Sequence, residues 1–385
     1  MKLLVVSHPC VTAINQSFFS DLQEQTGWRV TLVMPDRWKT EYGPIDGCAR
    51  WPAFQGNIDC RPVFFPGDIP RHVYRNWFVN LLRRESPDAI YMHHEPYGFS
   101  TFQVYLANQM TGQRPIGFYA AQNLLKNYPP PVRQLERWVF RRSSYAFPVT
   151  GVALDVLRKK HYTGTAEVLP LAVSSDLYKP SPIWSSERRQ TMGIPPGRVV
   201  FGYMGRLVEE KGLRTLFSAV ELLGDSDWEL LLVGGGPLEA ELRQRASGMG
   251  KTGKRIRFMG YVPHAEAPNW LSLFDVMVLP SETRSNWMEQ FGRVLIEAMA
   301  CGTPVLGSDS GEIPKIIQAT GGGLVFPEGA VSSLAEAMLQ LAGSAELRRN
   351  LAQVGRETVL TSYDQLHLTR RFATVIEGAL RNSKS

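Results

Sequence analysis

The chain has 385 residues, of which 44% are apolar and 20% are charged, and its formal net charge is +6. This composition is typical of a folded globular protein and excludes a disordered chain, and the length suits two domains of common size. No apolar run reaches the roughly 18 residues of a membrane-spanning helix, so the sequence predicts none.

The first half of the chain predicts a parallel sheet. Its opening run, MKLLVVSHPC, has an apolar stretch too short for a secretion signal and predicts a buried strand. Short apolar runs then alternate with longer segments of helical periodicity, which predicts strands covered by helices. The predicted strands are 2–6, 29–34, 88–93, 115–120 and 145–149.

The segment 71–88, RHVYRNWFVNLLRRESPD, places apolar side chains among four arginines. It predicts a basic amphipathic helix. Such a helix could rest on an anionic membrane, and it could equally pack its apolar stripe into the core with its arginines in water. The wider region 71–160 holds 13 Lys and Arg against 5 Asp and Glu, so the basic excess of the chain lies in its first half.

The segment 168–186, rich in Pro and Ser, predicts a linker between two domains. A second strand–helix series follows, and a last helix over 362–380 is expected to return to the first domain. We therefore expect an α/β protein with two doubly wound domains facing a cleft: 1–168, joined by 362–385, and 169–361. The predicted strands are 198–204, 228–233, 255–259, 275–279, 304–307 and 323–326, and the clearest helices are 211–223, 237–248, 293–300 and 331–341.

Two strand–turn–helix motifs open the second series. In FGYMGRLVEEKG, Arg206 and Lys211 follow a strand end, where two cations can neutralise a diphosphate or can simply pair with the glutamates beside them. In LLVGGGPLEAEL, Gly234 allows close approach of a ligand or serves only a tight turn. The second motif is not a dinucleotide fingerprint, because Glu239 occupies its third glycine position.

The stretch 289–314 begins with EQFGRVLIE, in which two carboxylates bracket an apolar run. If helical throughout, the segment from Glu289 to Glu297 spans ~12 Å, whereas glycosidase acid pairs lie about 5–9.5 Å apart. The spacing therefore favours two acids that hold opposite ends of one ligand, with a helix-start acid and a surface acid as the alternative. Gly292 precedes the helix, whose first-turn amides would form an anion site. Glu297 stands in so apolar a run that it needs a partner.

Four polar residues of the first half follow predicted strands. His8 and Cys10 lie after the first strand, where they could line the cleft as a Cys–His pair, although an ordinary loop is the stronger expectation. His94 and Glu95 lie after the third strand and either contact an acceptor or cap a loop. The four cysteines (Cys10, Cys48, Cys60, Cys301) lack metal-type spacing, so we expect free thiols and a cytoplasmic chain.

Together these motifs resemble glycosyltransferase family 4, whose members are retaining enzymes with the GT-B fold. The resemblance rests on Glu-x7-Glu in EQFGRVLIE, GRLVEEKG upstream and PVLGSDSGEIPKII downstream, and it covers residues 165–365. VLPLAVSSDLYKP is similar to the family's linker, and HHEPYGFS and PIGFYAAQN carry a weaker likeness.

The resemblance implies roles for single residues. Arg206 and Lys211 would contact the donor diphosphate, Glu289 would bind sugar hydroxyls and Glu297 would hold the ribose hydroxyls. No metal or other cofactor is implied, since two cations and a helix N-terminus would stabilise the leaving group. We expect Asp225-Ser226-Asp227 to be a turn and not a metal site. The remaining donor-binding residues implied are Gly205, Gly234, Tyr261, Val262, Phe291, Gly292, Arg293 and Val294.

The sequence departs from the family pattern twice. The loop SHPCVTAINQS, residues 7–17, lacks the glycines usual after the first strand. The segment FYAAQN has Ala121 where many relatives have a histidine, so we expect Gln122 or Asn123 to supply a polar contact there.

The reaction expected from the resemblance is retaining transfer of a hexose from a nucleotide-diphosphate donor. UDP-glucose is the first candidate donor. The acceptor would be a saccharide or lipid-linked saccharide in polysaccharide biosynthesis, at the inner face of the plasma membrane. The alternatives are a nucleotide-sugar epimerase or hydrolase on the same fold and a non-catalytic nucleotide-sugar-binding protein. Nucleic acid is not an expected partner, because only the charge would support it.

Overall fold

The structure is a computed structural model, and it describes residues 1–40, 43–46, 48–224 and 226–382. The chain divides into two compact units. Unit 1 comprises Met1–Ala172 and Gln365–Ser385, and unit 2 comprises Val173–Asp364. The domain ends expected from the sequence, 168 and 361, fall a few residues earlier than these divisions.

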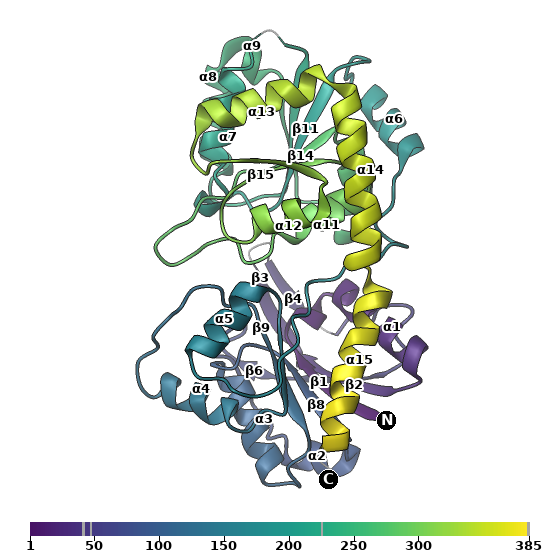
Figure 1. Cartoon of the computed structure of the whole chain (residues 1–385), viewed down its shortest axis with the longest axis vertical. Coiled ribbons are helices and arrows are strands. Elements are labelled where there is room, and N and C mark those ends of the chain that lie inside the picture. The colour runs from purple at the N-terminus through teal and green to yellow at the C-terminus, as the bar shows by residue number, and fades with distance from the viewer. Residues whose placement is uncertain (41–42, 47, 225, 383–385) are drawn as a thin grey trace. The chain divides into compact units, whose positions relative to one another are not determined.

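Unit 1 is built on a six-stranded sheet in the order β10-β9-β8-β1-β2-β5 (Figure 1), in which all neighbours are parallel. The five strands predicted for the first half are all present. The strands are β1 Lys2–Ser7, β2 Arg29–Pro35, β5 Asn57–Arg61, β8 Ala89–His93, β9 Ile116–Ala120 and β10 Tyr145–Pro148. The helices are η1 Pro9–Val11, η2 Ala13–Gln16, α1 Ser17–Thr26, α2 Val79–Glu85, α3 Phe99–Gln109, α4 Val132–Phe140, α5 Gly151–Lys159 and α15 Gln365–Asn382.

Helices cover both faces of this sheet, because its strands are apolar on both sides. Leu3 and Val5 of β1 belong to a core cluster with residues of α1 and α15. Leu4 and Val6 point the other way, into a cluster with residues of α2, α3, α4 and α5. Helix α15, the last of the chain, packs against α1 in unit 1, where Phe372 stacks on Phe147 at 4.7 Å between ring centroids.

The segment 71–88 is not one helix, so that prediction is wrong. The sequence analysis missed two short antiparallel strand pairs, and the second of them includes the start of this segment: β3 Arg37–Thr40 with β4 Gly43–Asp46, and β6 Val63–Phe64 with β7 Val73–Tyr74. Only α2 is helical within 71–88. Tyr74, Phe78, Leu81 and Leu82 are all buried in the core of unit 1, which confirms the core-packing alternative for these side chains.

The cysteines differ from the expectation of four free thiols, which is wrong. Cys48 and Cys60 form a disulfide, whereas Cys10 and Cys301 are buried free thiols. Cys60 lies in β5, an edge strand whose polar sequence gave no strand signal, and this strand brings the two cysteines together. The cytoplasmic expectation therefore loses the support it drew from free thiols.

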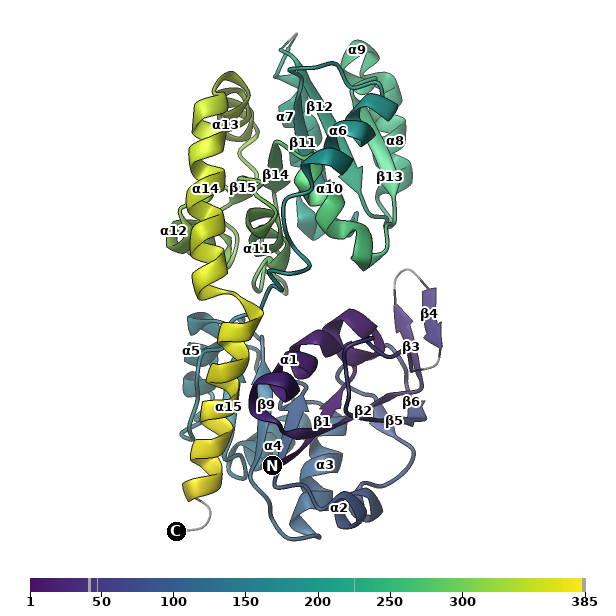
Figure 2. The ribbon, with the colours of Figure 1, turned by 90° about the vertical axis from the view of Figure 1, so that its right-hand side faces the viewer.

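Unit 2 repeats the architecture with a parallel sheet in the order β13-β12-β11-β14-β15-β16. All six strands predicted here are present, and Figure 2 shows the unit from the side. The strands are β11 Val199–Met204, β12 Trp228–Val233, β13 Ile256–Gly260, β14 Val276–Leu279, β15 Val305–Ser308 and β16 Gly323–Phe326. The helices are α6 Pro182–Thr191, η3 Glu209–Lys211, α7 Leu213–Glu221, α8 Glu239–Gly248, α9 Gly250–Gly253, η4 His264–Glu266, α10 Ala267–Leu273, α11 Arg293–Ala300, α12 Ile313–Thr320, α13 Val331–Gly343 and α14 Ala345–Ser362.

Helix α6 begins at Pro182, so the end of the predicted linker 168–186 is helical and belongs to unit 2. Its Trp184 ring packs on Trp270 of α10, 5.5 Å between centroids. Within the described ranges of the chain, no helix combines the length and the apolar composition that crossing a bilayer requires.

Candidate active site

A hollow of about 310 Å³ lies at the carboxyl ends of β11 and β14 in unit 2. Ligands of parallel sheets bind at this edge, because the loops and helix N-termini that follow the strands meet there. The lining residues come from three segments that are distant in sequence. They are Met204, Gly205, Arg206, Lys211, Leu279, Trp287, Glu289, Gln290, Gly292, Arg293 and Val294.

Two glycines, Gly205 and Gly212, shape the side of the hollow that carries Arg206 and Lys211. Gly205 has φ +153°, and the Tyr203 hydroxyl donates to the Arg206 carbonyl at 2.5 Å, which fixes the turn before the cation. Arg206 pairs with Glu210 at 3.4 Å. Gly212 has φ +62°, and a Cβ there would lie 1.8 Å from the Pro280 carbonyl oxygen. Only glycine lets the chain approach so closely, and this approach brings Lys211 beside the end of β14.

Lys211, Glu289 and Ser281 form one polar cluster. Lys211 Nζ lies 2.5 Å from Glu289 Oε2, and the Ser281 hydroxyl donates to the same oxygen at 2.8 Å. The ammonium also lies 5.1 Å from the Trp287 ring centroid, within cation–π range. The Lys211 and Glu289 side chains are only 14% and 9% exposed, so the pair is poorly screened by water. An ammonium has three donors, so Lys211 can hold Glu289 and still bind an anion.

The loop that carries Glu289 is held tightly. The Glu312 amide donates to the Glu289 carbonyl at 3.2 Å. A Cβ on Gly311, whose φ is +58°, would lie 2.1 Å from that carbonyl oxygen. Gly292, with φ +72°, is the N-cap of α11 and has no capping side chain. The first-turn amides of α11 therefore open beside Glu289, as an anion site would require.

Glu289 and Glu297 do not share a site. Glu289 precedes α11 and Glu297 lies within it, so the helix predicted over 293–300 is confirmed, and the segment between the two acids is helical only from Arg293 onward. Glu297 pairs with Arg293 at 3.0 Å and hydrogen-bonds to Tyr178. It therefore has the partner that its apolar surroundings demand. Burial and the Glu297 carboxylate raise the pKa of Tyr178.

The implied donor residues divide into two groups. Gly234 packs against unit 2 backbone, because a Cβ on it would lie 2.0 Å from the Gly205 carbonyl oxygen. Tyr261 is largely exposed after β13, and Phe291 is buried. The residues that line the hollow are Gly205, Arg206, Lys211, Glu289, Gly292, Arg293 and Val294, whereas Gly234, Tyr261, Val262, Phe291 and Glu297 lie outside its lining.

Sequence reasoning missed several members of the site. Met204 ends β11, Leu279 ends β14, and Gln290 follows Glu289. Ser281 is fully buried, and its hydroxyl orients the Glu289 carboxylate. The one feature of the sequence that could have indicated Ser281 is its place just after a predicted buried strand. The same feature indicated the other candidate residues.

In unit 1, two predicted histidines meet at the carboxyl ends of β1 and β8. His8 Nδ1 and His94 Nδ1 lie 2.9 Å apart. His72 and Trp38 join them, with ring centroids 4.9 Å from His94 and from His8, respectively. Burial, and then the neighbouring imidazoles, lower the pKa of His8 and His94 well below the usual range, so the cluster is neutral at pH 7. His72 and Trp38 gave no sequence signal, because they lie in or beside the missed hairpins.

Glu95 supports the loop that holds Gln122 and Asn123. Its Oε1 accepts a hydrogen bond from the Ala121 amide at 2.8 Å, and burial raises its pKa to about 7 against the opposing effects of that amide and Lys160. Gln122 and Asn123 are buried, and the Gln122 side chain donates to the Leu124 carbonyl at 3.0 Å.

Cys10 does not line a surface. Its thiol is fully buried in the core, where it donates to the Asn15 carbonyl, and burial raises its pKa to about 12. The Cys10–His8 nucleophile pair considered from the sequence is therefore not formed. The glycine-free loop 7–17 folds into η1 and η2, with amides of Val11, Thr12 and Asn15 donating within the loop.

Among the described residues, no group of three or more His, Cys, Asp or Glu side chains is arranged to hold a metal ion. Of the Asp-Ser-Asp triplet, Asp225 lies outside the described residues. Asp227 pairs with Arg198 at 2.7 Å.

Comparisons with known proteins agree with this geometry. Residues 185–358 match the model of the family "Glycosyl transferases group 1". Alpha-D-kanosaminyltransferase of Streptomyces kanamyceticus is 26% identical over 71% of this chain and 72% of its own length. N-acetyl-alpha-D-glucosaminyl L-malate synthase of Bacillus anthracis is 25% identical over 80% of this chain and 79% of its own.

The fold agrees as well. A crystal structure of HepE from Anabaena in complex with UDP superposes with a TM-score of 0.77 at 18% identity, covering 98% of this chain and 100% of that one. Unit 2 therefore carries a glycosyl transferases group 1 domain, and the chain has the GT-B fold of glycosyltransferases.

Proposed function

We propose that the protein is a glycosyltransferase that moves a hexose from a nucleotide-diphosphate donor to an acceptor hydroxyl with retention of the anomeric configuration. The observation that carries the proposal is the hollow of unit 2, where Arg206, Lys211 and the N-terminus of α11 surround Glu289. Two cations and free helix amides suit a diphosphate. A carboxylate held 2.5 Å from one of those cations suits the hydroxyls of the attached sugar.

In the proposed reaction the bond between the anomeric carbon and the diphosphate oxygen breaks. Arg206, Lys211 and the amides at Gly292 stabilise the charge that develops on the departing diphosphate. The acceptor oxygen bonds to the anomeric carbon from the same face, and its proton passes to an oxygen of the leaving phosphate. This route needs no protein base and no metal ion, in keeping with the roles proposed for the two cations.

UDP-glucose is the proposed donor. A fold relative in complex with UDP makes the uracil nucleotide the first choice. Glu297 is proposed to hold the ribose hydroxyls, with Arg293 and Tyr178 orienting its carboxylate. The proposed acceptor is a saccharide or lipid-linked saccharide of glycan biosynthesis, bound by unit 1 near His8, His94 and Glu95, where the strands of its sheet end.

Calorimetric titration with UDP-, GDP- and ADP-sugars tests the donor site. UDP-glucose should bind in the presence of EDTA. Glu289→Ala should weaken the binding of the sugar nucleotide more than that of free UDP, and Glu297→Ala should weaken the binding of both. The Glu239→Ala variant, which changes an acid of unit 2 outside the lining of the hollow, serves as control. If no nucleotide sugar binds, with EDTA or with added Mg²⁺, the proposal fails. The anomeric coupling constant of the product, measured by NMR, tests retention, and release of UDP without any acceptor would indicate hydrolysis instead.

We also propose that unit 1 contacts an anionic membrane, through the β6–β7 hairpin and not through a helix. Phe64, Phe65, Ile69 and Trp77 are exposed by 49%, 64%, 43% and 58%. The Arg75 guanidinium lies 4.8 Å from the Phe64 ring centroid. Exposed aromatic side chains beside arginines suit a lipid interface with anionic headgroups.

Flotation with phosphatidylglycerol and phosphatidylcholine vesicles tests this contact. The wild type should float with the anionic vesicles, and a Phe65→Ser/Trp77→Ser variant should float several-fold less. The Leu222→Ser variant, which changes an exposed apolar residue of unit 2, should behave as wild type. Equal flotation of all three proteins would refute the hairpin as the contact.

A further inference from the structure

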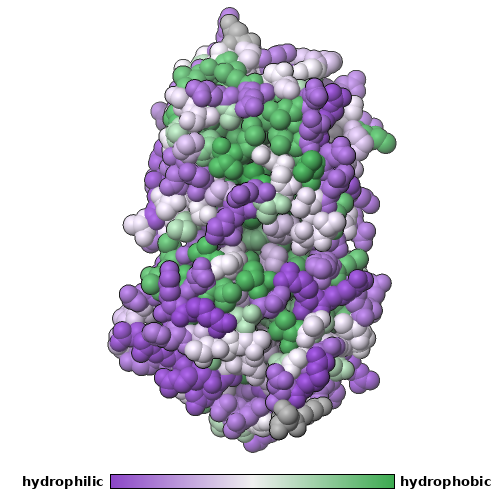
Figure 3. Space-filling view, viewed as in Figure 1, coloured by the Kyte–Doolittle hydropathy of each residue, from purple (hydrophilic) through white to green (hydrophobic). Residues whose placement is uncertain are grey.

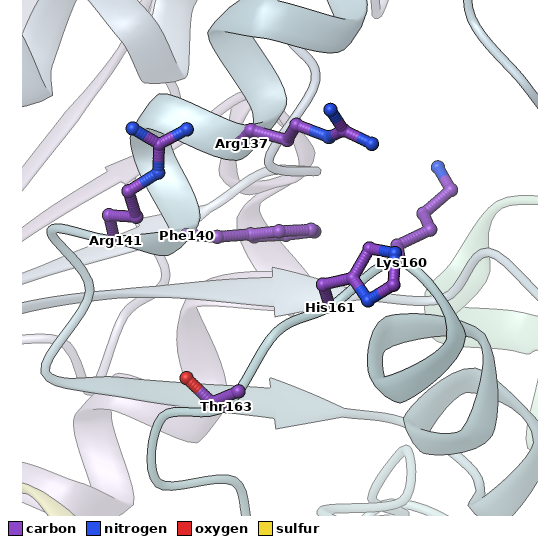
Figure 4. A pocket seen from close by; sticks show the side chains of 6 residues that line it. All are labelled: Arg137, Phe140, Arg141, Lys160, His161 and Thr163. Atoms are coloured by element: carbon purple, nitrogen blue, oxygen red, sulfur yellow. The ribbon is translucent and has the colours of Figure 1, made fainter.

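A second hollow of about 310 Å³ lies in unit 1, beside the ends of α4 and α5 (Figure 4). Figure 4 shows Arg137 and Arg141 along α4, Lys160 and His161 on the other side, and the Phe140 ring between them. Thr163 completes the lining. In the view of Figure 3, the surface over α4 is largely hydrophilic.

A smaller hollow of about 120 Å³ shares three of these residues. Arg137, Lys160 and His161 line both, and the second adds the cations of Lys126, Arg133 and Lys159. Glu136 is the only carboxylate in either lining. The two hollows therefore form one basic site, defined by the residues of the two linings.

The single carboxylate is already engaged. Lys160 Nζ pairs with Glu136 at 2.7 Å and lies 4.3 Å from the Tyr128 ring centroid. Burial raises the pKa of Glu136, and Lys160 opposes that rise. The Lys160 and Glu136 side chains are 10% and 5% exposed, so this pair anchors one wall of the basic site and neutralises little of the remaining charge.

The arginines near the site fall into two classes. Arg142 stacks over Trp138 at 4.1 Å, and Arg158 donates to the carbonyls of Tyr162 and Gly164 at 2.8 and 2.9 Å. These two have structural partners. By contrast, the guanidinium groups of Arg137 and Arg141 form no ion pair or hydrogen bond with any residue in the described part of the chain.

The spacing of the arginines on α4 brings like charges together without a counter-charge, which is unfavourable for the stability of the helix. Arg133, Arg137 and Arg141 follow one another at intervals of four, which places them along one face of α4 and its C-cap. Like charges at this spacing destabilise a helix. The α4 C-terminus favours the last cations through its dipole. A dianion between the guanidinium groups would offset the repulsion far more fully, because arginine forks bind phosphate with two hydrogen bonds.

His161 adds an independent observation. It has φ +69°, a left-handed conformation that helix ends normally assign to glycine. Its amide donates to the Arg158 carbonyl at 2.9 Å and the Tyr162 amide to the Leu157 carbonyl at 3.0 Å, so α5 ends in an ordinary left-handed cap. Helix termination alone would be served better by glycine, whereas an imidazole at this position supplies one more donor to the basic site.

We propose that the basic site of unit 1 binds the phosphate group of a small phosphomonoester. Arg137 and Arg141 would grip the phosphate, with His161 and the Thr163 hydroxyl as further donors. The Phe140 ring offers an apolar surface for the carbon skeleton, and the volume lies at the lower end of ligand pockets, which fits a sugar phosphate or one lipid headgroup. This inference does not depend on the proposed donor, since the basic site and the donor hollow lie in different units.

Calorimetry on the full chain tests the inference, with glucose 6-phosphate as the soluble probe and phosphatidic acid vesicles as the lipid probe. One of the two should bind saturably to wild type, more weakly as salt is raised. Arg137→Ala/Arg141→Ala should weaken binding at least tenfold, and Arg137→Lys/Arg141→Lys should recover part of it. His161→Gly should weaken binding while the melting temperature stays the same or rises, a result that a purely structural role would not give.

Lys251→Ala/Lys254→Ala, which removes two exposed charges from unit 2, is the matched control and should bind as wild type. The probe that binds identifies the source of the phosphate. The inference is overturned if neither probe binds saturably, if the control weakens binding as much as the arginine variant, or if only single-stranded RNA binds.

Discussion

Removal of Lys211 should destabilise unit 2 far more than removal of an exposed cation. Lys211→Met leaves the Glu289 carboxylate, 9% exposed, with only the Ser281 hydrogen bond of 2.8 Å among its contacts in that cluster. Loss of one partner from a buried ion pair costs about 3–5 kcal/mol, and the retained serine places the expected loss near the lower bound. Lys211→Met/Glu289→Gln removes the uncompensated charge as well, so it should recover about 2 kcal/mol.

Urea unfolding followed by circular dichroism and tryptophan fluorescence measures these differences, fitted with one transition per unit. The matched control is Arg243→Met, whose exposed pair with Glu239 at 2.8 Å should cost at most about 0.5 kcal/mol. The reasoning is refuted if the losses from Lys211→Met and Glu289→Gln simply add in the double variant, because coupled partners must not be additive.

Three further predictions follow from the same contacts. Gly311→Ala should lower the melting temperature by several degrees, and Gly329→Ala should lower it less. Both glycines have positive φ, but only a Cβ on Gly311 would meet backbone, 2.1 Å from the Glu289 carbonyl oxygen. Equal losses would contradict the steric argument. Cys10, with its pKa raised to about 12, should resist Ellman's reagent at pH 8 in the folded protein and react after unfolding in urea; rapid labelling of the native protein at Cys10 would disprove its burial. Burial raises the folded pKa of Glu95 to about 7, so its ionisation lowers the free energy of unfolding as pH rises from the unfolded pKa of about 4.5 to 7. The free energy of unfolding of Glu95→Gln, measured by urea titration, should therefore rise relative to that of the wild type across this pH range. A difference that stays constant with pH would argue against the shift.

The sequence was informative wherever a strand was apolar throughout. All eleven strands predicted from apolar runs are present, and they supply every strand of the two six-stranded sheets except β5. A strand buried on both faces needs this composition, so its signal is strong. The missed strand β5 is an edge strand with polar residues, and the β6–β7 hairpin has strands of two residues, so neither could give such a signal.

The segment 71–88 shows how a local pattern can mislead. Its aromatic and aliphatic residues resemble one helical stripe, yet Tyr74 pairs in a hairpin and Leu81 lies in α2. Both side chains enter the same core, because a strand and a helix can each bury one face. The periodicity of such a short stretch could not distinguish a strand followed by a short helix from one continuous helix.

The sequence by itself determined the α/β class, the strand positions and the glycine and acid motifs that precede helices. These features are local, since each depends on residue types within one strand, turn or helix. Only the tertiary structure decided which motifs share a site. It brought Lys211 to Glu289 and Ser281, tied Glu297 to Tyr178, and gathered His72 with His94. Those contacts join segments far apart in the chain, and close packing of the folded units, which no local pattern encodes, fixes their distances.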